Sequence, residues 1–118
     1  TAFAEGDVIL AKITPCFENG KAAVVPTLKH GLGFGSTEFH VFRPTGAVEA
    51  EYLFHFLRQE SLRRDGKNRM TGAVGQARVP VEFMRDLQLP VPPPCEQRRI
   101  IEKIEELLAQ VDEYQAAT

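Results

Sequence analysis

Apolar side chains recur at helical spacing through the last quarter of the chain. Successive positions are separated by four, three, four and three residues, the a/d pattern of a helix that packs along one stripe: Ile100, Ile104, Leu107, Val111 and Tyr114. Ile101 and Leu108 widen the stripe on one side. The pattern predicts a helix beginning near Pro94, because proline needs no N–H partner in a first turn and Glu96 suits the positive end of the helix dipole.

The apolar stripe of this helix must be buried against another surface. Two heptads are compatible with a helix that folds back on its own domain and with one that pairs with another helix. The connector Leu89–Pro94 favours the second, since a proline-rich segment is stiff and would hold the helix away from the preceding residues. The predicted helix–helix interface consists of Ile100, Ile101, Ile104, Leu107, Leu108 and Val111.

Upstream, short runs of β-branched and apolar residues alternate with turn residues. Val8–Ile13 and Lys21–Val25 are predicted to form two strands around a turn that contains Pro15 and the sequence Glu18-Asn19-Gly20. Glu38–Arg43 alternates as a third strand and ends before Pro44. The glycines at positions 31, 33 and 35 precede a strand and are not followed by a helix, which argues against a nucleotide-binding loop.

The period becomes helical from Val48 to about Arg64, with a buried face of Tyr52, Leu53, Phe56 and Leu57. A short turn or helix at Val81–Arg85 and a strand at Leu87–Val91 are predicted to follow. The fold class is therefore α+β, with one packed helix in a β-rich body. The predicted division is a body of residues 1–88 and a second unit, residues 89–118, made of the proline-rich connector and a coiled-coil-type helix.

Composition agrees with a soluble globular protein of one small domain and an appendage. Of the 118 residues 43% are hydrophobic and 25% are charged, and no apolar run approaches the length of a membrane span. Cys16 and Cys95 are far apart and lack metal-ligand spacing, so we expect reduced thiols, no metal site and a cytoplasmic location. No catalytic motif is present, and Cys16 has no recognisable activating partner, so we expect no catalytic residue and no cofactor.

Charge is unevenly distributed along the chain. The net charge is −2, but the segment from Arg58 to Arg78 holds six basic residues against two acidic ones. Its second half is a glycine-punctuated loop whose guanidinium, hydroxyl and amide groups suit phosphates and base edges. The candidate contacts in this loop are Arg69, Thr71, Gln76 and Arg78. A solvated loop is the simpler interpretation of the same residues.

Four further residues are candidate nucleic-acid contacts. Lys12 and Lys21 bracket the first turn and suit phosphates, although lysines also protect strand edges. Ser36 and Thr37 precede the third strand, where their hydroxyls suit phosphates or bases, although turn stabilisation is commoner.

Four stretches, in this order, resemble the DNA-specificity (S) subunit of type I restriction-modification systems: GDVILAKITPCFENGKAAVV, GFGSTEFHVFRP, TGAVGQARVP and LPVPPPCEQRRIIEKIEELLAQVDE. Cys95 departs from the residue usual before Glu-Gln-Arg-Arg and leaves the start of the helix intact. The resemblance covers nearly the whole chain, and it corresponds to the C-terminal half of one target recognition domain with the start of its spacer helix. The chain is therefore expected to be a piece of a longer protein.

The resemblance implies a non-catalytic reader of double-stranded DNA with a β-helix-like body. In that family two recognition domains are each followed by a long helix, and the helices pair antiparallel as a ruler between two half-sites. Methyltransferase subunits dock beside them and methylate adenine with S-adenosylmethionine, and the restriction subunit adds ATP-driven translocation and cleavage.

Two functions of different kinds remain open. The first is DNA target recognition through the basic loop and the lysines. The second is a protein-interaction or assembly module that acts through its C-terminal helix and binds DNA little. In either case, an apolar stripe without its partner helix predicts self-association of the isolated chain through Ile100, Ile104, Leu107 and Val111.

Overall fold

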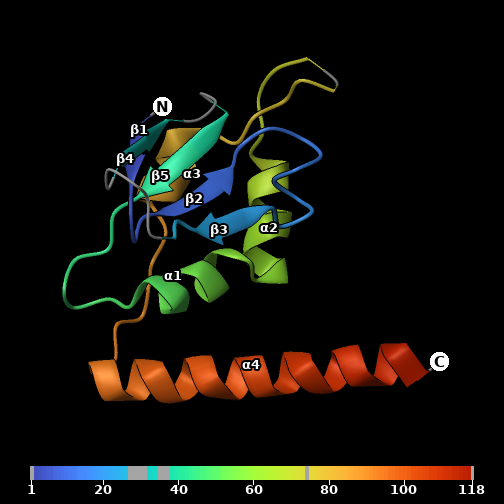
Figure 1. The fold of residues 1–118 in the computed structure, drawn as a ribbon. Coiled ribbons are helices and arrows are strands. Elements are labelled where there is room, and N and C mark those ends of the chain that lie inside the picture. The colour runs from blue at the N-terminus through green and yellow to red at the C-terminus, as the bar shows by residue number, and fades with distance from the viewer. Residues whose placement is uncertain (1, 27–31, 35–37, 74, 118) are drawn as a thin grey trace.

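The computed structural model describes residues 2–26, 32–34, 38–73 and 75–117. Its elements, in chain order, are β1 (Ala2–Ala4), β2 (Val8–Ala11), β3 (Ala22–Val24), β4 (Leu32–Phe34), β5 (Phe39–Phe42), α1 (Ala50–Leu57), α2 (Glu60–Asn68), α3 (Val81–Arg85) and α4 (Pro94–Ala117). The prediction of an α+β fold is confirmed (Figure 1).

The strands form two small antiparallel sheets. One has the order β3-β2-β5, with Leu10 opposite both Ala22 and His40, and the other pairs β1 with β4. The predicted β2–β3 hairpin and the strand at 39–42 are therefore confirmed. The described strands pair in antiparallel ladders, so they give no support to the β-helix-like body.

Asp7 joins the segments on either side of it. This buried carboxylate accepts a hydrogen bond from the Ala4 N–H at 2.8 Å and a bidentate pair from Arg43 at 2.9 and 3.0 Å. The hydrogen bond from Arg43 is the main cause that holds the pKa of Asp7 below its ordinary value. The pair therefore ties the turn after β1 to the residue that follows β5.

One apolar core lies between the three-stranded sheet and the helices. Its buried members come from β2, the following loop, α1, α2 and the region of α3: Val8, Leu10, Phe17, Leu53, Leu57, Leu62, Val79, Phe83 and Met84. Phe17 is fully buried, and Gly66 of α2 packs against it. A Cβ on Gly66 would lie 2.4 Å from the Phe17 Cζ, so this face of α2 accepts no side chain without displacing the ring.

The single helix predicted for 48–64 is wrong, because α1 ends at Leu57 and a second helix, α2, begins at Glu60. Gln59 adopts an extended conformation between them, with ψ of 140°. In one continuous helix Leu57 and Gly66 would lie on opposite faces, since nine residues correspond to about 180° at about 100° per residue. The break turns the chain so that both contribute to the same core.

The predicted strand at Leu87–Val91 is also wrong, because the chain from Leu87 to Pro93 forms no regular element. Prolines lack the N–H that a strand ladder requires, which explains the irregular path. The carbonyl groups of this connector bind side chains instead: Pro90 O accepts from Tyr52 Oη and Pro92 O accepts from Gln97 Nε2, each at 2.8 Å.

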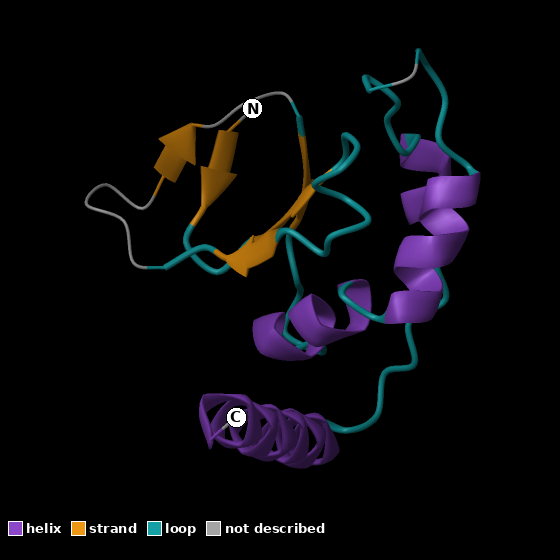
Figure 2. Ribbon diagram, turned by 90° about the vertical axis from the view of Figure 1, so that its right-hand side faces the viewer, coloured by secondary structure: helices purple, strands orange, loops and turns teal. Residues whose placement is uncertain are grey.

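The predicted helix at Pro94 is confirmed, but the expectation that the connector holds it away from the body is wrong. Figures 1 and 2 show α4 lying along the side of the body formed by α1. Ile101 is fully buried there, whereas Leu107, Leu108 and Val111 are 48%, 46% and 50% exposed. The division into residues 1–88 and 89–118 stays a prediction.

Candidate nucleic-acid interface

The loop from Thr71 to Arg78 is closed at its base by backbone pairing. Thr71 and Arg78 form an antiparallel bridge with hydrogen bonds of 2.9 and 3.0 Å, and Arg78 also pairs with Ile13 beyond the end of β2. The Val79 N–H donates to Lys12 O at 2.8 Å, which continues the attachment. Gly72 has a φ of +116°, a conformation that other residues rarely adopt. Figures 1 and 2 show this loop at the end of the molecule opposite α4.

The Arg78 guanidinium makes hydrogen bonds to other groups of the same chain. Its Nε and Nη2 donate to the two carboxylate oxygens of Glu38, each at 2.7 Å, and its Nη1 donates to Gln76 O at 2.7 Å. The bidentate pair lowers the pKa of Glu38 and raises that of Arg78 from their ordinary values, the hydrogen bond being the main cause for both. A base contact by Arg78 would require this fork to leave Glu38. Arg78 is thus placed to hold the loop against the strand that follows Glu38.

The structure brings both predicted lysines to the same end of the sheet. The Lys12 N–H donates to Glu38 O at 2.9 Å, and the Ala11 N–H donates to Lys21 O at 3.0 Å, so Lys12, just after β2, and Lys21, just before β3, lie at paired strand ends. Lys12 is half-buried and Lys21 is exposed. His40 lies in the same region, and its Nε2 is 3.1 Å from Val79 O. Burial is the main cause that lowers the pKa of His40, and the positive charge of Lys12 lowers it further. Lys12, Lys21 and the base of the loop therefore form one region.

Three predicted loop residues, Arg69, Thr71 and Gln76, have exposed side chains. Arg69 ends α2, and Thr71 and Gln76 belong to the loop itself, so the three follow one another toward the exposed end of the body. They have the accessibility that contact with a large ligand requires. Ser36 and Thr37 lie outside the described residues.

Part of the basic segment serves a structural purpose. Arg58 Nε donates to Gly20 O and Arg63 Nη1 donates to Glu18 O, each at 3.1 Å, so both cations bind backbone carbonyl groups of the loop after β2. Lys67 lies 4.0 Å from the Glu18 carboxylate. Part of the local positive charge is therefore used in contacts within the protein, so it gives no direct measure of a DNA-binding surface.

The junction between α1 and α4 depends on Gln97, a residue that the sequence pattern did not single out. The Gln97 side chain is fully buried and makes three hydrogen bonds of 2.8 Å, to Ala47 O, Pro92 O and the Glu49 N–H. Arg98 adds ion pairs to Glu49 at 2.6 Å and Glu51 at 3.5 Å. One signal was available: Gln97 precedes Ile101 by four residues, so it is a polar position on the same helical stripe.

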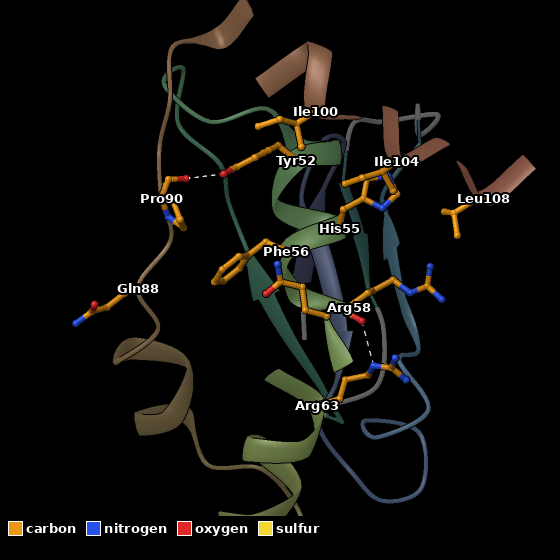
Figure 3. Close-up of a pocket in the computed structure, with 11 residues that line it drawn as sticks. Tyr52, His55, Phe56, Arg58, Arg63, Gln88, Pro90, Ile100, Ile104 and Leu108 are labelled. Atoms are coloured by element: carbon orange, nitrogen blue, oxygen red, sulfur yellow. Dashed lines mark hydrogen bonds between the residues drawn. The ribbon is translucent and has the colours of Figure 1, made fainter. Parts of the chain in front are cut away.

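Beyond this junction, a groove of about 600 Å³ is lined by α1 and α4, with Arg63 of α2 and with Gln88 and Pro90 of the chain before α4. Figure 3 shows Ile100 near Tyr52 and Ile104 near His55 in this groove. His55 Nε2 lies 3.9 Å from a Glu105 oxygen, and burial, opposed by this carboxylate, lowers the pKa of His55. Ile100 and Ile104 are half-buried, so the predicted interface divides into residues that meet the body and exposed residues farther along the helix.

Other site types gain no support from the described part of the chain. Within it, no group of three or more His, Cys, Asp or Glu side chains is arranged to hold a metal ion. Cys16 is half-buried, Cys95 is exposed, and both are free thiols. No helix among these residues is long and apolar enough to cross a bilayer.

A small α+β body carries an exposed loop at one end and, at the other, a helix whose distal turns are exposed. The family model of the type I restriction modification DNA specificity domain matches residues 1–116. The chain belongs to this family.

Two similar curated proteins are specificity subunits from Escherichia coli. The type I restriction enzyme EcoAI specificity subunit is 43% identical and the EcoEI specificity subunit 41% identical, each over 116 residues. Each match covers 98% of this chain and 20% of the relative, so the chain spans about a fifth of their length.

Solved structures show the same fold. The HsdS subunit from Thermoanaerobacter tengcongensis superimposes with a TM-score of 0.77 at 30% identity, over 98% of this chain and 29% of that chain. A chain from a structural study of complex assembly and conformational transition in a type I R-M system gives a TM-score of 0.69 at 20% identity, over 99% of this chain and 26% of that chain.

Proposed function

We propose that this chain supplies DNA sequence contacts and a spacer helix to a type I restriction-modification complex that recognises a bipartite DNA site in the cytoplasm. The observation that carries the proposal is the exposed loop at the end opposite α4, in a chain of the DNA specificity domain family. The chain acts as a targeting component, and the methyltransferase and restriction subunits supply the chemistry. No cofactor is assigned to the chain itself.

The loop and the lysines divide the proposed contacts by role. Thr71 and Gln76 are exposed and carry donors and acceptors suited to base edges. The exposed guanidinium of Arg69 suits a base edge or a phosphate, and Lys12 and Lys21 are placed for phosphates. Ser36 and Thr37 remain proposed contacts. For Arg78 we propose a role in positioning the loop instead of contacting bases, because three of its nitrogens donate to Glu38 and Gln76.

Salt dependence of DNA binding tests the role of Arg69. Each phosphate contact contributes a slope of about −0.9 to log K against log salt, so Arg69→Ala should flatten the slope by about that amount if Arg69 binds a phosphate. Arg64→Ala is the matched control, since Arg64 is an exposed arginine of α2, the helix whose C-cap residue is Arg69.

Base reading has a different signature. Gln76→Ala should weaken binding to the cognate duplex by about 1–3 kcal/mol while leaving non-cognate binding unchanged. Slopes and specificity ratios equal to those of wild type in both loop variants would contradict the assignment of this loop.

The second function, assembly through α4, is supported by its exposed distal turns. Leu107, Leu108 and Val111 are each about half exposed and form a surface for another helix, which in the complex is a second spacer helix beside the methyltransferase subunits. Without that partner, the isolated chain is expected to self-associate through these residues. Ile101 takes no part, because the body already buries it.

Sedimentation velocity over a range of concentrations tests this association. Leu107→Asp should shift the chain toward monomer, whereas Ala109→Asp should not, because residue 109 lies about 200° around the helix from residue 107. A wild-type chain that stays monomeric at high concentration would refute self-association, and the DNA-binding proposal would be unaffected.

A further inference from the structure

The attachment of α4 to the body depends on one buried amide. Both N–H groups of the Gln97 side chain donate, to Ala47 O and Pro92 O, and its oxygen accepts from the Glu49 N–H. These partners belong to the segment before α1, to the residue that precedes the first turn of α1, and to the proline-rich connector. A single side chain therefore joins two parts of the chain, the segment just before α1 and the proline-rich connector, to the first turn of α4.

The surrounding contacts keep the direction of α4 fixed. Arg98 reaches Glu49 and Glu51 at the start of α1, and Ile101, one turn after Gln97, is fully buried. Tyr52 secures the connector by its hydrogen bond to Pro90 O. Beyond Ile104, the described side chains of α4 are exposed as far as Glu113, so the restraint is concentrated in the first three turns of the helix.

A small change of angle at this junction would move the far end of α4 by a large distance. A helix of 24 residues is about 36 Å long at a rise of about 1.5 Å per residue. A tilt of about 10° at its base would move its far end by about 6 Å, which is close to two base-pair steps at about 3.4 Å each. A helix that measures a DNA distance therefore needs a stiff attachment to the domain that reads the sequence.

We propose that Gln97, supported by Arg98, is a positioning residue that fixes the angle between α4 and the recognition body and thereby sets the spacing between half-sites that the complex accepts. This inference rests on the proposed function. A buried amide suits this role better than an apolar side chain, because hydrogen bonds prescribe direction as well as contact.

The angle can be measured in the chain itself. With Cys16 and Cys95 replaced, nitroxide labels at Glu60→Cys on α2 and Asp112→Cys on α4 report the distance between the body and the distal helix by electron–electron double resonance. The labelled chain is diluted with an excess of unlabelled chain, so that self-association adds no distance between two labelled chains. Gln97→Met keeps the side-chain length and removes all three hydrogen bonds, so we expect a broader distance distribution. Gln110→Met, an exposed glutamine of the same helix, is the matched control and should leave the distribution unchanged.

Spacing selectivity is measured in the assembled methyltransferase complex. Methylation is compared on duplexes whose half-sites have the native separation or one base pair more or fewer. We expect Gln97→Met to lower the ratio of native to altered spacing by at least about threefold, the effect of losing a single neutral hydrogen bond. The preference for the half-site sequence itself should be retained.

The outcomes separate the two proposals. An unchanged distance distribution and an unchanged spacing ratio in Gln97→Met would overturn the positioning role while leaving DNA recognition intact. A wild-type complex without preference for its sequence would overturn the proposed function, and the distance measurement would still decide whether Gln97 fixes the helix. If Gln97→Met fails to fold, Arg98→Gln removes only the partly exposed ion pairs and should broaden the distribution less, in the same direction; no broadening there would overturn the inference.

Discussion

Replacing Gly66 by alanine should destabilise the protein, against the usual effect of such a change in a helix. In an exposed helix interior, glycine to alanine is stabilising by about 1 kcal/mol. Here the new Cβ would lie 2.4 and 2.5 Å from two ring carbons of Phe17 and 3.2 Å from Phe83 Cε2. Phe17 is fully buried in a close-packed core, so its ring cannot move aside without disturbing neighbours.

The magnitude follows from the two opposing effects. Overpacking of a core costs about 1–3 kcal/mol, which outweighs the gain in helix propensity and leaves a net loss of about 1 kcal/mol. For a protein of 118 residues this corresponds to a fall in Tm of about 4 °C. Urea unfolding followed by far-ultraviolet circular dichroism measures the change, and the m-value should stay constant if only the native state is affected.

Two further variants make the test specific. Gly46→Ala is the control, because a Cβ there meets nothing within 4 Å, and it should change stability by less than about 0.5 kcal/mol. Phe17→Leu creates room, so the loss caused by Gly66→Ala should be smaller in that background, with a coupling energy of about 1 kcal/mol. A Gly66→Ala protein that is more stable than wild type would refute the close packing of α2 on Phe17.

Three other expectations concern titration and loop restraint. Because burial lowers the pKa of His40, the unfolded chain binds a proton first, so stability is complete above about pH 6.5 and falls as the pH decreases toward the lowered pKa; His40→Gln should reduce this slope in urea midpoints measured across the range, and an identical slope would count against it. The lowered pKa of Asp7 places its stabilisation above about pH 3.9 and its loss below that value, so Asp7→Asn should flatten the acid limb of the same profile; an acid limb as steep as that of wild type would show that Asp7 does not cause it. Arg63→Met removes the hydrogen bond to Glu18 O and should accelerate amide exchange in residues 16–20, whereas Arg64→Met should not; equal rates in both variants would exclude the tether.

Local signals predicted the elements whose causes lie within a few residues. Runs of β-branched and apolar residues between turn residues located β2 and β3, alternation located β5, and Pro94 with Glu96 located the start of α4. The break between α1 and α2 escaped prediction, because it allows Leu57 and Gly66 to face the same core, in which Gly66 lies against Phe17, 49 residues earlier in the sequence. Tertiary packing decided where the helix ends.

The candidate site was predictable to a similar extent. Composition drew attention to the loop containing Arg69, Thr71 and Gln76, and the structure leaves those side chains exposed. Arg78 has the same chemistry, but its partner Glu38 is 40 residues away, and no local pattern announces such a pair. Gln97 resembled an ordinary surface position of a charged helix until its burial placed it at the junction.

The backbone pairing of Thr71 with Arg78 separates the folded body of the protein from the loop between these two residues. Changes between these two positions leave the ladder at the base of the loop and the core beneath it untouched, and doubling the length of a loop costs only about 0.6 kcal/mol in closure entropy. The loop can therefore be exchanged as a unit while the body and α4 keep their geometry, and under the proposed function such an exchange would change the DNA sequence preference alone.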